Sequence, residues 1–181
     1  MAEKIGLFYG SSTGAGERAA LLMKQIIEQS GVATVETAIV SSDNLKVMEN
    51  YQYLIFGCST WNIGELQDDW ALKFNELDVV NFSGRKVALY GNGDQYGYSN
   101  TFVDAIGMIG NKVAARGGEI VGFWPRDGYE FEFSKGAFEN TMMGLPLDDD
   151  NEPEKTNQRV TNWIYWVMEQ FGMPMPVPEA A

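Results

Sequence analysis

Residues 4–17 read Lys4-Ile-Gly-Leu-Phe-Tyr-Gly-Ser-Ser-Thr-Gly-Ala-Gly-Glu17, and this stretch decides the fold. An apolar run at residues 5–9 breaks into a loop rich in glycine and hydroxyl groups. Apolar residues at helical spacing then follow at Ala19, Leu22, Met23, Ile26 and Ile27. A strand that leads into a helix through such a loop leaves unpaired backbone N–H groups at the helix N-terminus, where an anion is favoured. We therefore expect residues 11–16 to bind a phosphate group.

Other kinds of loop share parts of this pattern. A nucleotide-triphosphate loop needs G-x-x-x-x-G-K-S/T, and no lysine or arginine occurs in the loop before Arg18. The run from Gly14 to Ala19 does fit the dinucleotide pattern G-x-G-x-x-A. However, the first glycine of that pattern should turn directly off the strand, and here Gly10 already occupies the strand end. A plain turn before a helix, without any ligand, is the remaining alternative for the loop taken alone.

The rest of the chain repeats the alternation of strand and helix. Apolar runs that end in glycine occupy residues 53–56 and 87–90, another run occupies residues 120–124, and residues 35–40 are a weaker candidate. Such runs are typical of buried parallel strands. Apolar residues at helical spacing lie between and after them, at Phe102, Ala105, Ile106, Ile109 and Val113 and at Val160, Trp163, Ile164, Val167, Met168 and Phe171. This order predicts a doubly wound α/β fold with helices on both faces of a parallel sheet.

Two loops at the predicted ligand edge each carry a large aromatic residue. Trp61 follows Gly57 and Tyr98 follows Gly91, and both aromatics lie among small and polar residues. These loops and the loop at Gly10 leave the carboxyl ends of their strands, where doubly wound sheets bind ligands. Two aromatic rings on neighbouring loops can hold a flat ring between them. A phosphate at one end and a planar ring at the other describe a mononucleotide-like cofactor.

The two aromatic loops resemble those of flavodoxins of the long-chain type, which occur in cyanobacteria and other bacteria. The resemblance runs from about residue 4 to about residue 172. Its most specific parts are Tyr51-Gln-Tyr-Leu-Ile-Phe-Gly-Cys-Ser-Thr-Trp-Asn-Ile-Gly-Glu-Leu-Gln67 and Gly91-Asn-Gly-Asp-Gln-Tyr-Gly-Tyr-Ser-Asn100. It implies a flavodoxin-like, five-stranded parallel sheet of order 2-1-3-4-5 with helices on both faces. The stretch from about residue 125 to about residue 151 resembles the insertion that splits the last strand of long-chain members.

The resemblance also implies a cofactor, non-covalent flavin mononucleotide (FMN). By matching positions, residues 11–16 hold the phosphate with help from Thr60, while Trp61 and Tyr98 flank the isoalloxazine ring. Backbone groups of the two aromatic loops bond the polar edge of the ring, and Asp150 lies near the ribitol. The predicted cofactor-binding residues are Ser11, Ser12, Thr13, Gly14, Ala15, Gly16, Ser59, Thr60, Trp61, Asn62, Ile63, Gly64, Asn92, Gly93, Asp94, Gln95, Tyr98 and Asp150.

One residue departs from the family pattern. Flavodoxins usually carry the phosphate-loop motif Ser/Thr-x-Thr-Gly-x-Ser/Thr, and its last position is Gly16 in this chain. Backbone donors remain, so we expect FMN to bind, either more weakly or with a changed loop conformation. A flavodoxin-like protein that has lost FMN is an alternative, and Gly16 is the one residue that favours it.

The resemblance implies a low-potential one-electron carrier that shuttles between the semiquinone and hydroquinone forms of FMN and can replace ferredoxin. Acidic surroundings and a dry aromatic site disfavour the anionic hydroquinone and so lower the potential of that couple. The alternative on the same fold is an FMN-dependent quinone or nitro reductase, which needs an open ring face for a hydride donor and a substrate. We expect an electron carrier without catalytic residues, and not an enzyme.

The acidic composition bears on the partners. The chain has 25 Asp and Glu against 13 Lys and Arg, with a formal net charge of -12. Such a charge repels nucleic acids and speeds encounter with basic protein surfaces, although solubility alone explains it equally well. The resemblance implies redox partners of the ferredoxin–NADP reductase, photosystem I or nitrogenase class.

Length and residue usage limit the other possibilities. At 181 residues we expect one domain over residues 1–172 and a proline-rich, frayed or extended tail over residues 173–181. The chain has a single cysteine, Cys58, and no histidine, which argues against an intramolecular disulfide, an iron–sulfur cluster held by several cysteines and a histidine metal site. Without a histidine to activate it, Cys58 is expected to be a small buried residue. No signal pattern or membrane-length apolar segment occurs, so we expect a cytoplasmic monomer that does not insert into membranes.

Overall fold

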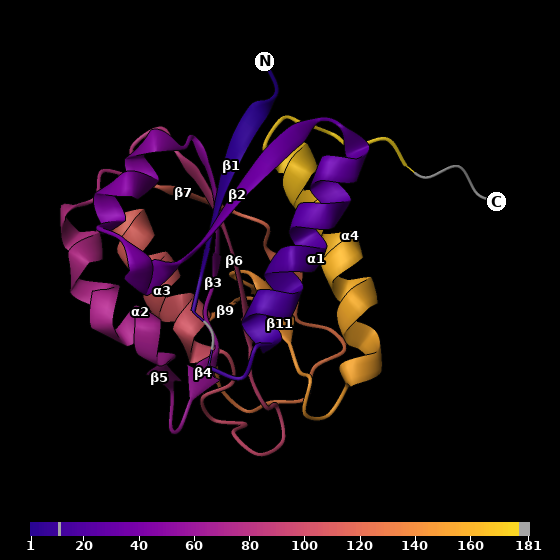
Figure 1. Ribbon diagram of the computed structural model, residues 1–181. Coiled ribbons are helices and arrows are strands. Elements are labelled where there is room, and N and C mark those ends of the chain that lie inside the picture. Colours follow the sequence, from indigo (N-terminus) through magenta and orange to yellow (C-terminus); the bar gives the residue numbers. More distant parts are fainter. Residues whose placement is uncertain (11, 178–181) are drawn as a thin grey trace.

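The computed structural model describes residues 1–10 and 12–177 and has a parallel sheet at its centre (Figure 1). The sheet order is β11-β6-β3-β1-β2, with β7 also paired to β6, and every pair in it is parallel. Its strands are β1 (Glu3–Tyr9), β2 (Ala33–Ile39), β3 (Tyr53–Gly57), β6 (Lys86–Asn92), β7 (Glu119–Val121) and β11 (Leu145–Leu147).

The last position in the sheet is filled by two short strands. β7 pairs with β6 from Lys86 to Ala88, and β11 pairs with β6 from Tyr90 to Asn92. Since β3 takes the other edge of β6, β7 and β11 are the two halves of one split strand. The predicted order 2-1-3-4-5 with an insertion in the last strand is therefore confirmed.

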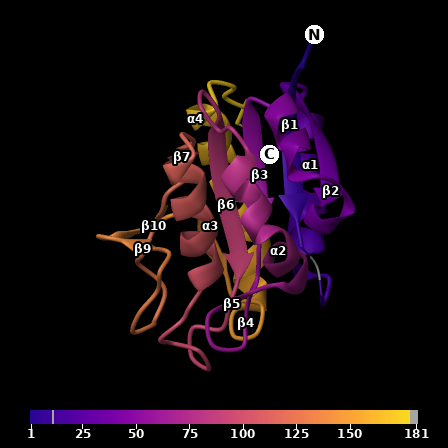
Figure 2. The ribbon, with the colours of Figure 1, turned by 90° about the vertical axis from the view of Figure 1, so that its left-hand side faces the viewer.

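The boundaries of that insertion differ from the expected ones. The strand predicted over residues 120–124 ends at Val121, because Gly122 takes a left-handed conformation with φ 77°. The chain returns to the sheet at Leu145, so the insertion covers residues 122–144, and Asp150 follows the returning strand β11. Within the insertion, β8 (Trp124–Pro125), β9 (Ala137–Phe138) and β10 (Thr141–Met142) form a small antiparallel sheet on the side of α3 (Figure 2).

Helices cover both faces of the sheet (Figure 1). α1 (Ala15–Ser30) and α4 (Thr156–Gln170) lie on one face, and α2 (Asp68–Lys73) and α3 (Asp104–Ala115) lie on the other. Short 3-10 helices occur at η1 (Val40–Ser42), η2 (Leu45–Asn50), η3 (Phe74–Val79) and η4 (Pro153–Lys155), and a two-stranded hairpin joins β4 (Thr60–Trp61) to β5 (Glu65–Leu66).

Two hydrophobic cores, one on each face, hold these layers together. Alternate residues of β1 divide between them: Leu7 packs towards α1 and α4, and Phe8 packs towards the other face. A fully buried tryptophan anchors each core, Trp163 in α4 and Trp70 in α2. Burial of such large side chains stabilises the fold by about 25 cal/mol per Å² of apolar surface.

Three further features bear on the sequence-based expectations. Cys58 is buried, as expected, and burial raises the pKa of its thiol. In the C-terminal segment, residues 173–177 form no helix or strand, yet Met175 is buried in the core beside α4. Within the described ranges, no helix is both long enough and apolar enough to cross a membrane.

Candidate functional site

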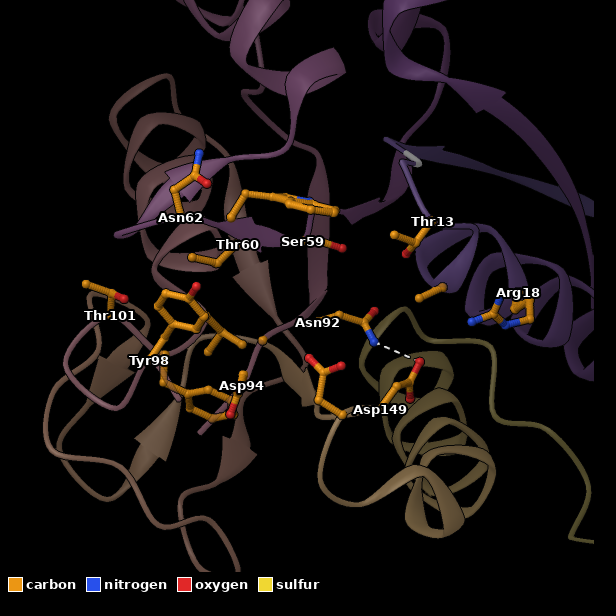
Figure 3. Close-up of a pocket in the computed structure, with 16 residues that line it drawn as sticks. Thr13, Arg18, Ser59, Thr60, Asn62, Asn92, Asp94, Tyr98, Thr101 and Asp149 are labelled. Carbon is orange, nitrogen blue, oxygen red and sulfur yellow. Dashed lines mark hydrogen bonds between the residues drawn. The ribbon is translucent and has the colours of Figure 1, made fainter. Parts of the chain in front are cut away.

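A cavity of about 610 Å³ opens at the carboxyl edge of the sheet, where the loops after β1, β3 and β6 meet. Figure 3 shows Thr13 at one end of it, Asn62 and Tyr98 towards the other, and Ser59 and Asn92 between them. The lining residues are Thr13, Ala15, Arg18, Ser59, Thr60, Trp61, Asn62, Asn92, Gly93, Asp94, Tyr98, Thr101, Phe102, Val103, Asp149 and Asp150. Eleven of these sixteen were predicted as cofactor-binding residues.

One end of the cavity is the start of α1. Gly14 is its N-cap residue, with φ 88°, and no side chain caps the helix there. The first N–H groups of a helix have no partner within it, so they remain available to an anion. Thr13 adds a hydroxyl on the cavity wall, and Ala15 opens the helix beside it. Ser11, which was also predicted to bind here, lies outside the described residues.

A buried glutamine, Gln67, holds the loop after β1 by hydrogen bonding. Gln67 is 2% exposed, and its Nε2 donates to the Ser12 hydroxyl oxygen at 3.1 Å. Its Oε1 accepts from the backbone N–H groups of Asp69 (3.0 Å) and Trp70 (3.4 Å), which caps α2. The contact with Gly10 is so close that a Cβ there would lie 1.8 Å from Gln67 Oε1. One side chain thus connects the loop after β1 to the loop after β3.

Gly16, the residue that departs from the family pattern, is buried in the first turn of α1. The Tyr90 hydroxyl donates to its carbonyl oxygen at 2.8 Å, and burial raises the pKa of Tyr90. A Cβ on Gly16 would lie 3.0 Å from the carbonyl oxygen of Gly10. The loop therefore has no room for a larger residue here unless its backbone shifts by a few tenths of an ångström.

The other end of the cavity carries the two aromatic side chains. Trp61 is 38% exposed and Tyr98 is 49% exposed, and both line the cavity wall. This exposure leaves apolar ring surface on the cavity wall for a ligand to cover. Beside Trp61, Asn62 takes a left-handed conformation with φ 46°, and its Nδ2 donates to Glu65 Oε2 at 2.8 Å.

Thr60 makes a contact that the sequence did not predict. Its Oγ1 accepts a hydrogen bond of 3.0 Å from the backbone N–H of Ala105, in the first turn of α3. In Figure 3, Thr60 lies on the side of Asn62 and Tyr98, away from Thr13. The structure therefore places Thr60 nearer the aromatic end of the cavity than the helix end. Ser59, one residue earlier, lies between the two.

Six of the predicted residues within the described ranges do not line the cavity. They are Ser12, Gly14, Gly16, Ile63, Gly64 and Gln95. Ile63 projects into solvent and is 81% exposed, whereas Gly64, with φ 74°, forms the turn of the hairpin. Gln95 is buried, and its Nε2 donates to Asp148 Oδ2 at 2.8 Å. Of these six residues, Gly16 and Gln95 are buried behind the cavity, whereas Ser12 and Ile63 are exposed to solvent.

Acidic residues line one wall of the cavity, from Asp94 near Tyr98 to Asp149 beside Asn92 (Figure 3). Burial disfavours the charged form of Asp94, but hydrogen bonds from the Gly97 N–H, the Asn151 amide and the Tyr96 N–H outweigh it and lower the pKa of Asp94. The pKa of Asp150 is raised, first by burial and then by the neighbouring charges of Asp94, Asp148 and Asp149. This wall of the cavity is strongly negative.

Similarity to known proteins agrees with this geometry. The family model described as Flavodoxin matches residues 7–163. The chain belongs to the flavodoxin family. A flavodoxin from Nostoc sp. is 44% identical over 173 residues, which cover 96% of this chain and 100% of the relative. A flavodoxin from Synechocystis sp. is 45% identical, covering 89% of this chain and 94% of the relative.

Solved structures of flavodoxins have the same fold. The flavodoxin of Fusobacterium nucleatum bound to flavin mononucleotide superposes with a TM-score of 0.87 at 27% identity, covering 93% of this chain and 98% of that chain. Oxidised Flavodoxin 2 from Bacillus cereus gives a TM-score of 0.71 at 22% identity, covering 93% of this chain and 99% of that chain. The second similarity concerns the fold alone.

Sequence reasoning missed five residues that line the cavity of this flavodoxin: Arg18, Thr101, Phe102, Val103 and Asp149. Val103 has φ 48°, an uncommon conformation for a β-branched residue, and it precedes α3 as N-cap. No local pattern signals such a residue. Arg18 lies one helical turn after Gly14, and its backbone N–H donates to the Gly14 carbonyl oxygen at 2.9 Å, a position that is apparent only in the folded helix.

The donors and acceptors of the flavodoxin cavity fit a phosphate ester that carries a polar, planar ring. The helix end offers backbone N–H groups and a hydroxyl, which bind phosphate oxygens. Towards the middle, Asn92 Oδ1 is buried and has no hydrogen-bond partner among the described residues, although Asn92 Nδ2 donates to Asp149 Oδ2 at 3.0 Å. Buried acceptors nearly always have a partner, so a donor on a bound molecule would satisfy this oxygen.

Proposed function

We propose that this flavodoxin carries single electrons with non-covalently bound FMN. The observation that carries the proposal is one cavity with an uncapped helix N-terminus at one end and two half-exposed aromatic side chains, Trp61 and Tyr98, at the other. Bound FMN supplies the redox chemistry, since its ring accepts and releases electrons one at a time. The protein binds the cofactor, orients it and sets its electrostatic surroundings.

At the helix end, the loop after β1 holds the phosphate. The free N–H groups of the first turn of α1 donate to its oxygens, and the Thr13 hydroxyl adds another donor. Ser12 acts from behind, because Gln67 holds its hydroxyl and thereby fixes the loop. Gly16 contributes backbone rather than a side chain. We include Ser11 in the same set by its place in the motif.

At the aromatic end, Trp61 and Tyr98 flank the flavin ring, and backbone groups of their loops bond its polar edge. The backbone groups are those of Asn62, Ile63 and Gly64 on one loop and of Asn92, Gly93, Asp94 and Gln95 on the other. Ser59 and Thr60 continue the first loop towards the ribityl chain, and Asp150, which lines the same cavity, lies near that chain by the family resemblance. An aromatic side chain on each side excludes water from the ring.

The acidic wall gives this site its low potential. Asp94, Asp149 and Asp150 line the cavity, and each carboxylate makes a further negative charge on the cofactor less favourable. A unit charge about 4 Å away costs about 1 kcal/mol in water and about 4 kcal/mol at an effective dielectric of 20. About 1.4 kcal/mol corresponds to about 59 mV for one electron. The acidic residues therefore lower the potential of the second one-electron reduction by the order of 100 mV.

We propose further that the protein is a carrier and not an enzyme, because Trp61 and Tyr98 leave no open ring face for a hydride donor. As a low-potential carrier it replaces ferredoxin in the cytoplasm. Its partners are redox proteins with basic docking surfaces, of the ferredoxin–NADP reductase, photosystem I or nitrogenase class. The net charge of -12 supports transient docking by a monomer.

Titration of the apoprotein with FMN, followed by the quenching of flavin fluorescence, tests the binding part of this proposal. We expect tight binding of one FMN per chain. The reconstituted protein should then oxidise NADPH or NADH only when a separate reductase is added. Steady oxidation of either nucleotide by the purified protein alone would instead identify a reductase, and failure to bind FMN would contradict the proposal altogether.

A further inference from the structure

Arg18 is the one basic side chain that lines the cavity, as far as the described residues go. It lies on the first turns of α1, at the same end of the cavity as Thr13 (Figure 3). Its guanidinium rests against the start of the helix, since a Cβ added to Gly14 would lie 3.2 Å from Arg18 Nη1. A positive charge therefore lies next to the free N–H groups of the helix end.

The guanidinium of Arg18 is also uncommitted. Arg116 donates to the Val80 carbonyl, Arg85 donates to the Asn81 and Ser83 carbonyls, and Arg159 forms an ion pair with Glu152. Arg18 makes no comparable side-chain hydrogen bond or ion pair within residues 1–10 and 12–177. An arginine that points at a ligand site without a protein partner is suited to bind an anion there.

The nearest acidic side chain of the cavity does not need this charge. Asp149 lines the cavity with Arg18, but both of its carboxylate oxygens already accept hydrogen bonds. Asn92 Nδ2 donates to one oxygen, and the Thr156 hydroxyl donates to the other. Asp149 is therefore already paired, and among the described residues Arg18 remains available to an anionic ligand.

The phosphate loop lacks a hydroxyl at residue 16, and Arg18 can add a phosphate contact that this residue does not make. Gly16 brings no hydroxyl, and a Cβ there would lie 3.0 Å from the Gly10 carbonyl oxygen, so a serine or threonine does not fit without a shift of the loop. Helix N–H groups bind phosphate oxygens without neutralising their charge, and Glu17 adds a negative charge close by. A cation beside the loop offsets both effects.

We propose that Arg18 binds the phosphate of the cofactor and makes this flavodoxin select FMN over riboflavin, which has the same ring and no phosphate. The inference rests on the proposed function and adds to it the residue that recognises the anionic end. Because Arg18 is exposed, water and salt weaken its contribution, and we expect a factor of about five to ten in affinity rather than several orders of magnitude.

The test compares the dissociation constants of FMN and riboflavin for the apoproteins of the wild type, Arg18→Gln, Arg18→Lys and Lys46→Gln. Lys46 is exposed and does not line the cavity, so its change matches the loss of charge without touching the site. We expect Arg18→Gln to bind FMN about five to ten times more weakly and riboflavin unchanged. Arg18→Lys should keep most of the FMN affinity, and Lys46→Gln should keep all of it.

A second measurement uses inorganic phosphate as the probe. Phosphate should raise the thermal unfolding temperature of the wild-type apoprotein more than that of Arg18→Gln, because it binds only the folded state. Equal FMN affinity in the wild type and Arg18→Gln, or equal losses for FMN and riboflavin, would overturn the role of Arg18 and leave the proposed function intact. Failure of the wild type to bind FMN would overturn both.

Discussion

The two ends of the cavity are held in different ways. At the helix end, two side chains hold the described part of the loop after β1: Gln67 donates to the Ser12 hydroxyl, and the Tyr90 hydroxyl donates to the Gly16 carbonyl. At the aromatic end, a dense network of acidic and amide groups fixes the loop after β6. Its members are Asp94, Gln95, Asp148, Asn151, Glu152 and Arg159.

This difference separates two properties of a flavin carrier. We propose that hydroxyls, helix N–H groups and one arginine at the helix end recognise the phosphate, so they contribute to the affinity for the cofactor. We propose that the aromatic rings and carboxylates towards the other end surround the flavin ring, so they set its potential and add to the affinity. Changes at the helix end should therefore alter affinity with little effect on potential, whereas changes at the aromatic end should alter the potential, together with the affinity where a ring is removed.

The largest effect is expected from Gln67→Ala, which removes the support of the helix end. The change leaves the Ser12 hydroxyl and the N–H groups of Asp69 and Trp70 without their buried partner, so we expect a loss of about 2–3 kcal/mol in unfolding free energy. Urea denaturation of the apoprotein measures it. FMN affinity should also fall, by more than riboflavin affinity.

The exposed Gln52 provides the matched control for that change. Gln52→Ala should alter the unfolding free energy by no more than about 0.5 kcal/mol. Similar losses in the two variants would show that the hydrogen bonds of Gln67 do not hold the loop.

At the aromatic end, Glu152→Gln should lower the unfolding free energy at pH 7 by about 2 kcal/mol. Burial disfavours the Glu152 carboxylate, but hydrogen bonds from Lys155, Arg159 and Gln95 outweigh it and lower its pKa from 4.5 to about 2. A lowered pKa stabilises the fold above pH 4.5, and this contribution is lost as the pH falls through about 2. The deficit of the variant, measured by urea denaturation, should therefore be full at pH 7 and shrink between pH 4.5 and pH 2.

Glu154→Gln changes the same chemical group two residues away, at an exposed position. Its unfolding free energy should follow that of the wild type across the whole pH range. A deficit of Glu152→Gln that stays constant down to pH 2 would contradict the role given to this ion pair.

Tyr98→Ala removes one aromatic wall, with an expected loss of about 1–2 kcal/mol in binding free energy. FMN and riboflavin should lose affinity equally, about fivefold to thirtyfold, since the ring is common to both. The potential of the second one-electron reduction should rise, because water reaches the ring. Fluorescence titration and a redox titration measure the two effects.

Tyr96 is the natural control, since it is similarly exposed, lies two residues away and does not line the cavity. Tyr96→Ala should leave both affinity and potential unchanged. If Tyr98→Ala leaves them unchanged as well, Tyr98 does not belong to the site.

The smallest effect is expected from Asn62→Gly. Asn62 holds φ 46°, and glycine reaches this and neighbouring conformations more easily. By the family resemblance, we propose that the peptide between Asn62 and Ile63 would turn its carbonyl towards the ring of bound FMN on one-electron reduction. Glycine should ease that turn and separate the two one-electron potentials by a further 20–40 mV, about 0.5–1 kcal/mol.

A redox titration measures this separation. Glu65→Gln serves as the comparison, because it weakens the side-chain bond to Asn62 and leaves the backbone unchanged. A smaller separation in Asn62→Gly than in the wild type would show that the peptide does not control the first step.

The fold was predictable because its central strands carry a local signal. β1, β3 and β6 are continuous apolar runs that end beside glycine, and they are buried on both faces. The edge strand β2 alternates buried and exposed residues, so its signal was weaker. The helix α2 has only six residues and gave no periodic pattern, and a left-handed Gly122 ended β7 earlier than its apolar composition indicated.

Some residues of the site were also predictable from local sequence, and others were not. Thr13, Trp61 and Tyr98 stand out within their own loops, and the structure brings them to one cavity. Asp149 lines the cavity because β11 pairs with the end of β6 and carries the following residues towards Asn92, a register that no short segment encodes. Arg18 was missed for a different reason: one charged residue on a helix has no distinguishing pattern until its surroundings are known.

Anaerobic photoreduction of the FMN-reconstituted protein, followed by visible absorption, tests most directly whether this flavodoxin moves one electron at a time. A long-wavelength band should appear during the first step and bleach during the second, which gives two separate one-electron reductions. Direct bleaching in a single two-electron step, with no intermediate band, would contradict the carrier role and favour a reductase.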